Sequence, residues 1–116
     1  MKYLCLIYGE EASWATRPEQ DAKQMTAEYM TYTDDIRRSS HYVAGEALMP
    51  TATASTVRIR NGKLVTTDGP FAETKEQLGG FYLIEATDLN DAIQVASRIP
   101  GAKWGSIEVR PIKKVG

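Results

Sequence analysis

The sequence has almost none of the residues that build disulfides and common metal sites. It contains a single cysteine, Cys5, and a single histidine, His41. One cysteine excludes an internal disulfide, and one histidine with scattered carboxylates lacks the spacing of a metal-ligand set. We therefore expect no bound metal. A lone thiol in an apolar run is typical of a small core residue, and it suits a reducing compartment such as the cytoplasm.

An excess of charge and long hydrophobic runs are also missing. The 14 Lys and Arg residues nearly balance 15 Asp and Glu residues, which leaves no electrostatic signature of a nucleic-acid or membrane partner. The apolar run near the N-terminus is too short for a signal-peptide core or a membrane span. No glycine-rich loop leads into a helix, so we expect no phosphate-bearing cofactor. The length fits one domain, residues 1–116.

The chain begins with the pattern of a strand, a loop and a long helix. Residues 2–8, KYLCLIY, are apolar at nearly every position, which indicates a strand covered on both faces. Residues 9–17 are predicted to form a loop, and Pro18 can open a helix. An apolar stripe then predicts a helix of roughly 20 residues that ends near Ser40, built on Ala22, Met25, Tyr29, Tyr32 and Ile36. The charged residues beside this stripe, including Arg37, are predicted to be solvated surface.

The clearest local signal is a β-hairpin with strands at 56–60 and 63–67. Asn61-Gly62 joins the strands and suits the two positive-φ positions of a type I′ turn. The turn fixes the register of the two strands, and with it the face that each side chain occupies. It places three apolar side chains on one face and two arginines on the other: Val57, Ile59 and Leu64 against Arg58 and Arg60.

The remaining elements predict an α+β fold. Strands are expected at 41–48, 80–86 and 106–110, and a helix at 87–99 with Thr87-Asp88 as its cap. Without the hairpin the order is β-α-β-β-α-β, which is the split βαβ or ferredoxin-like arrangement. We therefore predict a ferredoxin-like fold with an inserted β-hairpin.

The predicted sheet has more apolar surface than its own helices can cover. Two helices cover one face, yet strands 2–8 and 80–86 carry apolar side chains on both faces. A second copy of the same sheet is the economical cover, related by twofold symmetry. We expect a homodimer in which two sheets pack face to face and enclose a hollow for a small molecule.

The run DGPFAETKEQLGG, residues 68–80, is the richest in side chains that do chemistry. Asp68 can bond its own backbone, Gly69 tolerates unusual φ values, and a proline fixes the exit direction. One interpretation is a rigid turn that seats Phe71 in the core. The other is a ligand site, because polar loops at strand ends beside a cavity often hold one. Gly79-Gly80 would let the backbone pass close to another group.

This run, together with MKYLCLIYGEE, GEALMPTATASTVRIRNGK and SIEVRPI, resembles the YCII-related family in the branch named for its DGPF motif. The resemblance covers nearly the whole chain. It implies a ferredoxin-like fold that dimerises into an α/β barrel, a bacterial source, and an enzyme-like acidic residue in a cleft, which Asp68 matches. It also implies a link to extracytoplasmic-function sigma factors. Other parts of the family carry a His-Asp pair, but this branch does not usually show a histidine at the place of His41.

Asp68 is therefore the first site candidate, as a proton acceptor or a ligand contact, with turn capping as its alternative role. Glu46 follows Gly45 at a strand end and is a candidate pocket residue. The other candidates have competing roles as surface, ion-pair or core residues, and they are Arg58, Lys75, Tyr82, Trp14, Tyr8 and His41. Tyr8 and Tyr82 lie in predicted strands. Trp14 lies in a predicted loop, where it could act as a lid over a cavity.

Three functional hypotheses remain open on the sequence. The first is a cofactor-independent enzyme with Asp68 as acid or base, acting on a small organic molecule. The second is a ligand-binding or regulatory accessory protein without turnover, and the third is a structural interaction module. The polar loop favours the first two hypotheses over the third. The lack of an evident acid-base pair favours the second over a strong claim of catalysis.

Overall fold

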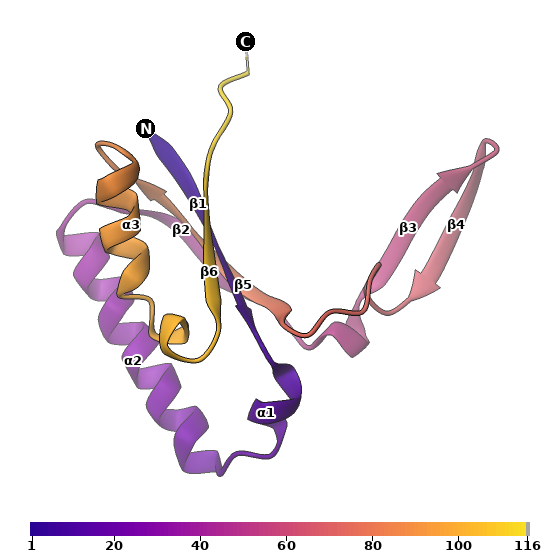
Figure 1. Ribbon diagram of the computed structural model, residues 1–116, viewed down its shortest axis with the longest axis horizontal. Helices are drawn as coiled ribbons and strands as arrows, with labels where there is room; N and C mark the ends of the chain where they lie inside the picture. The colour runs from indigo at the N-terminus through magenta and orange to yellow at the C-terminus, as the bar shows by residue number, and fades with distance from the viewer. Residues whose placement is uncertain (116) are drawn as a thin grey trace.

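The centre of the fold is a four-stranded antiparallel sheet with strand order β2-β5-β1-β6 (Figure 1). It is seen in a computed structural model that describes residues 1–115. The strands of this sheet are β1 (Lys2–Gly9), β2 (Tyr42–Ala47), β5 (Gln77–Glu85) and β6 (Ser106–Pro111). The helices α2 (Glu19–Arg38) and α3 (Leu89–Ser97) lie together on one face of the sheet. This α+β arrangement is consistent with the predicted ferredoxin-like fold.

The hydrophobic core lies between that face and the two helices. Alternate residues of the central strands are buried there, and they pack on the inward residues of α2 and α3: Tyr3, Cys5, Tyr82 and Ile84 against Tyr32, Ile36, Ala92, Val95 and Ala96. Cys5 has no exposed surface, which confirms it as a core residue, and burial raises the pKa of its thiol to about 11. The intervening residues Leu4, Leu6 and Leu83 are only half-buried, because no helix within residues 1–115 covers their face.

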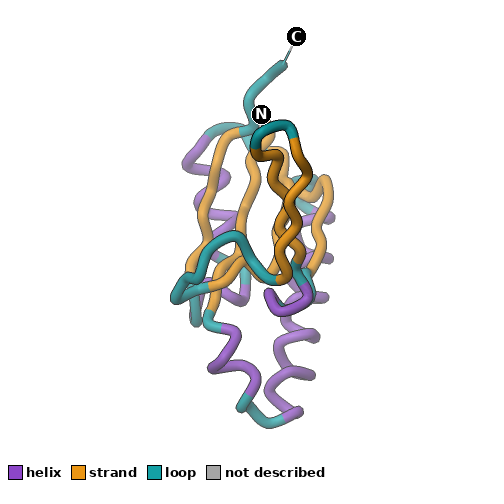
Figure 2. Tube along the Cα trace, turned by 90° about the vertical axis from the view of Figure 1, so that its right-hand side faces the viewer, coloured by secondary structure: helices purple, strands orange, loops and turns teal. Residues whose placement is uncertain are grey.

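The predicted hairpin is a separate two-stranded sheet of β3 (Ser55–Arg60) and β4 (Lys63–Asp68). Asn61 and Gly62 both have positive φ, and Ile59 pairs with Leu64 as predicted. The hairpin projects away from the four-stranded sheet as an arm (Figure 1), and it points toward the viewer in Figure 2. Its apolar face is therefore open in the single chain, with Val57, Ile59 and Leu64 exposed by 62%, 61% and 66%.

Several element boundaries differ from the prediction. The segment predicted as a loop at 9–17 contains a short helix, α1 (Glu11–Ala15), which has no side-chain cap to mark it. Strand β5 begins at Gln77, earlier than expected, and so contains Gly79-Gly80. A Cβ at Gly80 would lie 2.8 Å from the carbonyl oxygen of Glu46, which confirms a close backbone approach there. Short 3₁₀ turns, η1 (Thr51–Thr53) and η2 (Pro100–Lys103), complete the connections.

The turn after β4 is ordered by two hydrogen bonds at Gly69 and does not seat Phe71 in the core. The Gly69 amide donates to the Ala54 carbonyl at 2.7 Å, and the Thr56 hydroxyl donates to the Gly69 carbonyl at 2.9 Å. Gly69 has a φ of 98°, a conformation that favours glycine. Phe71 is 78% exposed in the single chain, so the prediction of a buried Phe71 is wrong for this subunit.

Candidate functional site

A cavity of about 660 Å³ lies between α2 and the sheet. One line of α2 side chains at a spacing of four residues forms one wall: Met25, Tyr29, Thr33 and Arg37. Residues four apart lie on nearly the same face of a helix, and a rise of about 1.5 Å per residue gives this line a length of about 18 Å. The facing wall comes from the adjoining ends of β1, β2 and β5, and Trp14 and Trp104 also line the cavity.

Tyrosine rings form the centre of the cavity wall. The Tyr82 ring lies 6.5 Å from the Tyr29 ring in a stacked arrangement and 6.3 Å from the Tyr42 ring in an edge arrangement. The Tyr82 hydroxyl shares a 2.6 Å hydrogen bond with the Thr33 hydroxyl, and the Tyr29 hydroxyl accepts from the Gly101 amide at 3.1 Å. Burial raises the pKa of both Tyr29 and Tyr82, so both phenols are neutral at neutral pH.

Arg37 brings a positive charge to one end of the α2 line. Its guanidinium lies over the Tyr42 ring, 4.6 Å from the ring centroid, which is a cation–π contact. Within residues 1–115 no carboxylate lies within ion-pair distance of Arg37. The neighbouring Arg38, by contrast, pairs with Asp35 at 2.6 Å. The guanidinium of Arg37 therefore keeps its hydrogen-bond donors free of the carboxylates of residues 1–115.

Both tryptophans of the chain lie at the cavity, and an arginine holds them together. The rings of Trp14 and Trp104 meet edge to face with centroids 6.2 Å apart. The guanidinium of Arg17 lies 4.3 Å from the Trp14 ring and 4.6 Å from the Trp104 ring. These contacts fasten α1 and its following turn to the segment after η2.

Glu11 anchors α1 to the far side of the cavity. Its two carboxylate oxygens accept from the amide and the hydroxyl of Thr51, each at 2.8 Å. Its own amide donates to the side-chain oxygen of Gln77 at 2.9 Å. Three hydrogen bonds thus fix the first turn of this short helix against η1 and the start of β5.

Three of the six predicted site residues line this cavity. Trp14 and Tyr82 contribute their rings, and Glu46 lies on β2, where it pairs with Phe81. Tyr8, weighed in the sequence as a cavity residue, also lines it. Among the residues described here, no group of three or more His, Cys, Asp or Glu side chains is placed to hold a metal ion.

The other three predicted site residues lie outside the cavity of the single chain. Asp68 ends β4 opposite Ser55 and is exposed, and its carboxylate makes no hydrogen bond with residues 1–115. Arg58 is half-buried in the hairpin, and Lys75 is exposed in the loop before β5. One subunit therefore does not bring the acidic turn and the cavity together.

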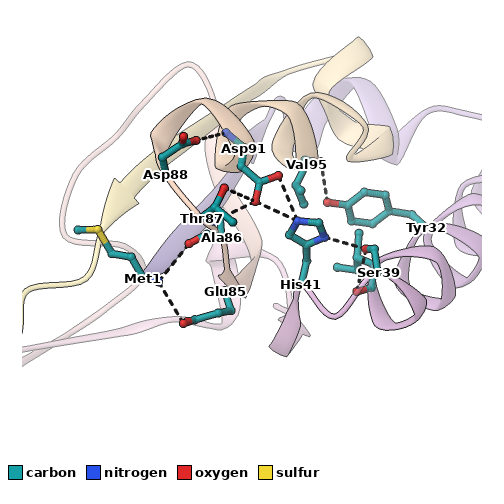
Figure 3. A network of polar contacts seen from close by, with 11 residues as sticks. Met1, Tyr32, Ser39, His41, Glu85, Ala86, Thr87, Asp88, Asp91 and Val95 are labelled. Carbon is teal, nitrogen blue, oxygen red and sulfur yellow. Dashed lines mark hydrogen bonds and ion pairs between the residues drawn. The ribbon is translucent and has the colours of Figure 1, made fainter.

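His41 takes part in a separate polar network at the end of α2 (Figure 3). Its Nδ1 lies 2.7 Å from the Ser39 hydroxyl, and its Nε2 lies 3.2 Å from both Asp91 oxygens. The Thr87 amide donates to Asp91 at 3.0 Å, and this bond, with that of His41, holds the pKa of the Asp91 carboxyl below its usual value. The network links the C-terminal end of α2 to α3 through Ser39, His41 and Asp91. None of these residues lines the cavity.

Sequence reasoning missed Thr33 and Arg37 as cavity residues. The expectation of solvated surface suits Arg38, but Arg37 is exposed and also lines the cavity. The signal that identifies both is a spacing of four that continues from Met25 and Tyr29 of the apolar stripe.

The fold and cavity thus define an α+β protein with an aromatic-lined pocket under its long helix. The sequence of residues 1–115 matches the family described as the YCII-related domain, and the chain belongs to that family. It is also similar to an uncharacterized protein of Rhizobium meliloti (strain 1021), with 33% identity over 114 residues, which is 97% of this chain and 92% of the relative. Among the described residues, no helix is long and apolar enough to cross a membrane.

Proposed function

We propose that this protein binds a small organic molecule in the cavity between α2 and the sheet. The observation that carries the proposal is the convergence of rings and hydroxyls from several elements on one cavity of about 660 Å³. Small-molecule sites are typically pockets of about 300–1,000 Å³ with mostly apolar walls and a few placed polar groups. Tyr29, Tyr82 and Trp14 supply apolar walls here, while Thr33 and Arg37 supply polar groups.

A fragment screen with a matched pair of variants tests this proposal. Ala47 lines the cavity, so Ala47→Phe places a ring in the space that a ligand would take. Ala27→Phe adds the same ring on α2 at a shallow hollow that does not share its residues with the cavity. Fragments that raise the melting temperature of the wild type should bind Ala47→Phe at least about tenfold more weakly and Ala27→Phe unchanged. Equal binding to both variants would place the ligand elsewhere.

The proposal includes the sheet-to-sheet homodimer expected from the sequence. Two apolar surfaces that are open in the single chain support it: the sheet face with Leu4, Leu6 and Leu83, and the apolar face of the hairpin. Burial of about 600 Å² of apolar surface per subunit would contribute about 15 kcal/mol before the costs of association. Asp68 does not line the cavity of its own chain, so in this proposal it reaches a cavity only in the dimer.

Acid-base catalysis by Asp68 is the catalytic part of the proposal. Asp68→Asn keeps the shape of the side chain and removes its charge. We expect the variant to keep its melting temperature and to lose turnover of whatever ligand the screen identifies. A fall in stability with turnover intact would assign Asp68 to the turn instead.

The alternative is a non-catalytic accessory or regulatory protein linked to an extracytoplasmic-function sigma factor in the cytoplasm. The position of Asp68 outside the cavity of its own chain favours this alternative. The sigma-factor link rests on the family resemblance alone. A bound ligand that is recovered chemically unchanged after long incubation with the protein would support binding without turnover.

A further inference from the structure

The charges around the cavity are divided between its two ends. Arg37 is the one Lys or Arg residue that lines it among residues 1–115. The acidic lining residues lie toward the other end: Glu10 and Glu11 belong to α1 and its start, and Glu46 lies four residues along β2 from Tyr42. At about 3.3 Å per residue, that separation along the strand is about 13 Å. The positive charge of Arg37 therefore lies far from Glu46, the acidic lining residue of β2.

Arg37 is exposed to solvent, but an aromatic contact positions its guanidinium at this end. Its guanidinium stacks over Tyr42, and Tyr42 packs edge to face on Tyr82. A planar guanidinium that is already positioned loses little freedom when it binds a carboxylate through two parallel hydrogen bonds. The geometry thus favours an anionic group with two oxygens in a plane.

The neighbouring polar groups also favour a ligand that accepts hydrogen bonds. The Tyr29 hydroxyl accepts from the Gly101 amide and makes no donated bond within residues 1–115, so its proton is available. Tyr82 and Thr33 share one hydrogen bond between their hydroxyls, which leaves one of the two protons available. Tyrosine rings surround these donors, and rings pack best on other planar apolar groups.

We propose that the ligand of this cavity is a planar aromatic carboxylate, with its carboxylate on Arg37 and its ring against Tyr82 and Tyr29. This inference rests on the proposed function and adds the chemical class of the ligand. Arg37 is then the residue that determines specificity, and the two tyrosines shape the site for a flat ring.

Titration calorimetry with trans-cinnamate and cinnamamide tests the inference. The two probes have nearly the same shape and differ in charge, so the ratio of their affinities reports the contribution of the carboxylate. We expect cinnamate to bind wild type at least about tenfold more tightly than cinnamamide, as a charged hydrogen-bonded pair would give. In Arg37→Gln the ratio should fall to about one, and in the control Arg38→Gln it should stay at the wild-type value, because Arg38 pairs with Asp35 outside the cavity.

Each other outcome overturns the inference in a recognisable way. Equal affinities of the two probes for wild type would remove the preference for a carboxylate. A preference that persists in Arg37→Gln would place the carboxylate on another residue. Absence of binding by both probes would exclude this ligand class, and the fragment screen would then decide separately whether the cavity binds anything.

Discussion

Gly45 shows how one residue makes room for the cavity wall. It pairs with Tyr82 across β2 and β5, and a Cβ at this position would lie 2.8 Å from the Tyr82 ring. The absence of a side chain at residue 45 therefore lets the ring lie flat against the strand. From there Tyr82 contacts Tyr29, Tyr42 and the Thr33 hydroxyl.

The first prediction follows from this close contact. Gly45→Ala should lower the free energy of unfolding by about 1–3 kcal/mol, because the added methyl group displaces the Tyr82 ring. Gly9→Ala is the control, since a Cβ at Gly9 meets no atom within 4 Å. Urea unfolding of both variants measures the difference, and equal stabilities would show that the ring moves aside without cost.

The second prediction concerns pH and Asp91. Because hydrogen bonds from the Thr87 amide and His41 lower the pKa of Asp91, the charged carboxylate stabilises the folded state. The sign follows from linkage: this stabilisation is fully present above the unfolded pKa of about 3.9, and it is lost as pH falls through the lower folded-state pKa. Asp91→Asn should therefore have a lower melting temperature than wild type at pH 6, and the gap should close as the pH falls below about 4.

The exposed Asp34 provides the control for this experiment. Asp34→Asn should leave the melting curve of the protein nearly unchanged across the same pH range, because surface carboxylates without partners contribute little. A wild-type advantage over Asp91→Asn that persists undiminished at the lowest pH would contradict the assignment.

At the scale of elements, the hydrophobic pattern and the turn residues identified the strands of the fold and both α2 and α3. KYLCLIY predicted a strand because it is apolar throughout, and Asn61-Gly62 predicted both the turn and the register of the hairpin. Helix α1 was missed because its five residues carry neither a capping side chain nor an apolar repeat. Its helical turn depends on Glu11 and on the Trp–Arg–Trp contacts, which join segments far apart in the sequence.

The cavity was harder to predict than the fold for a related reason. A polar residue that faces a cavity has the same sequence pattern as one that faces solvent, and Arg37 and Arg38 are neighbours with opposite outcomes. Glu46 and Tyr82 were found because each lies in a recognisable strand, and Trp14 was found in the segment that was predicted as a loop and forms α1. Whether Asp68 joins them depends on a second subunit, which a single chain does not contain.

The third prediction tests the anchor of α1. Glu11→Ala removes the acceptor of two hydrogen bonds from Thr51, so the free energy of unfolding should fall by about 1–3 kcal/mol. Glu10→Ala should have little effect, because the bond from Ser13 to Glu10 uses the backbone carbonyl and not the side chain. Chemical unfolding monitored by tryptophan fluorescence compares the two. Matching stabilities would mean that Glu11 does not anchor the helix.

At the scale of the whole molecule, the fourth prediction is the homodimer. The open sheet face and the projecting arm present apolar surface that a second copy would cover (Figure 1). Light scattering coupled to size exclusion, repeated over a dilution series, should give twice the mass of one chain down to low concentration. A stable monomer throughout the series would contradict the packing of two sheets and, with it, a role for Asp68 at the cavity.

The location of the ligand is the central claim, and the two tryptophans report on it directly. The chain has only two, and both line the cavity, so an ¹⁵N-labelled sample gives one indole signal from Trp14 and one from Trp104. Titration with a bound fragment should shift at least one of the two indole signals in wild type and neither in Ala47→Phe. Saturating binding that leaves both indole signals in place while other signals move would contradict the account.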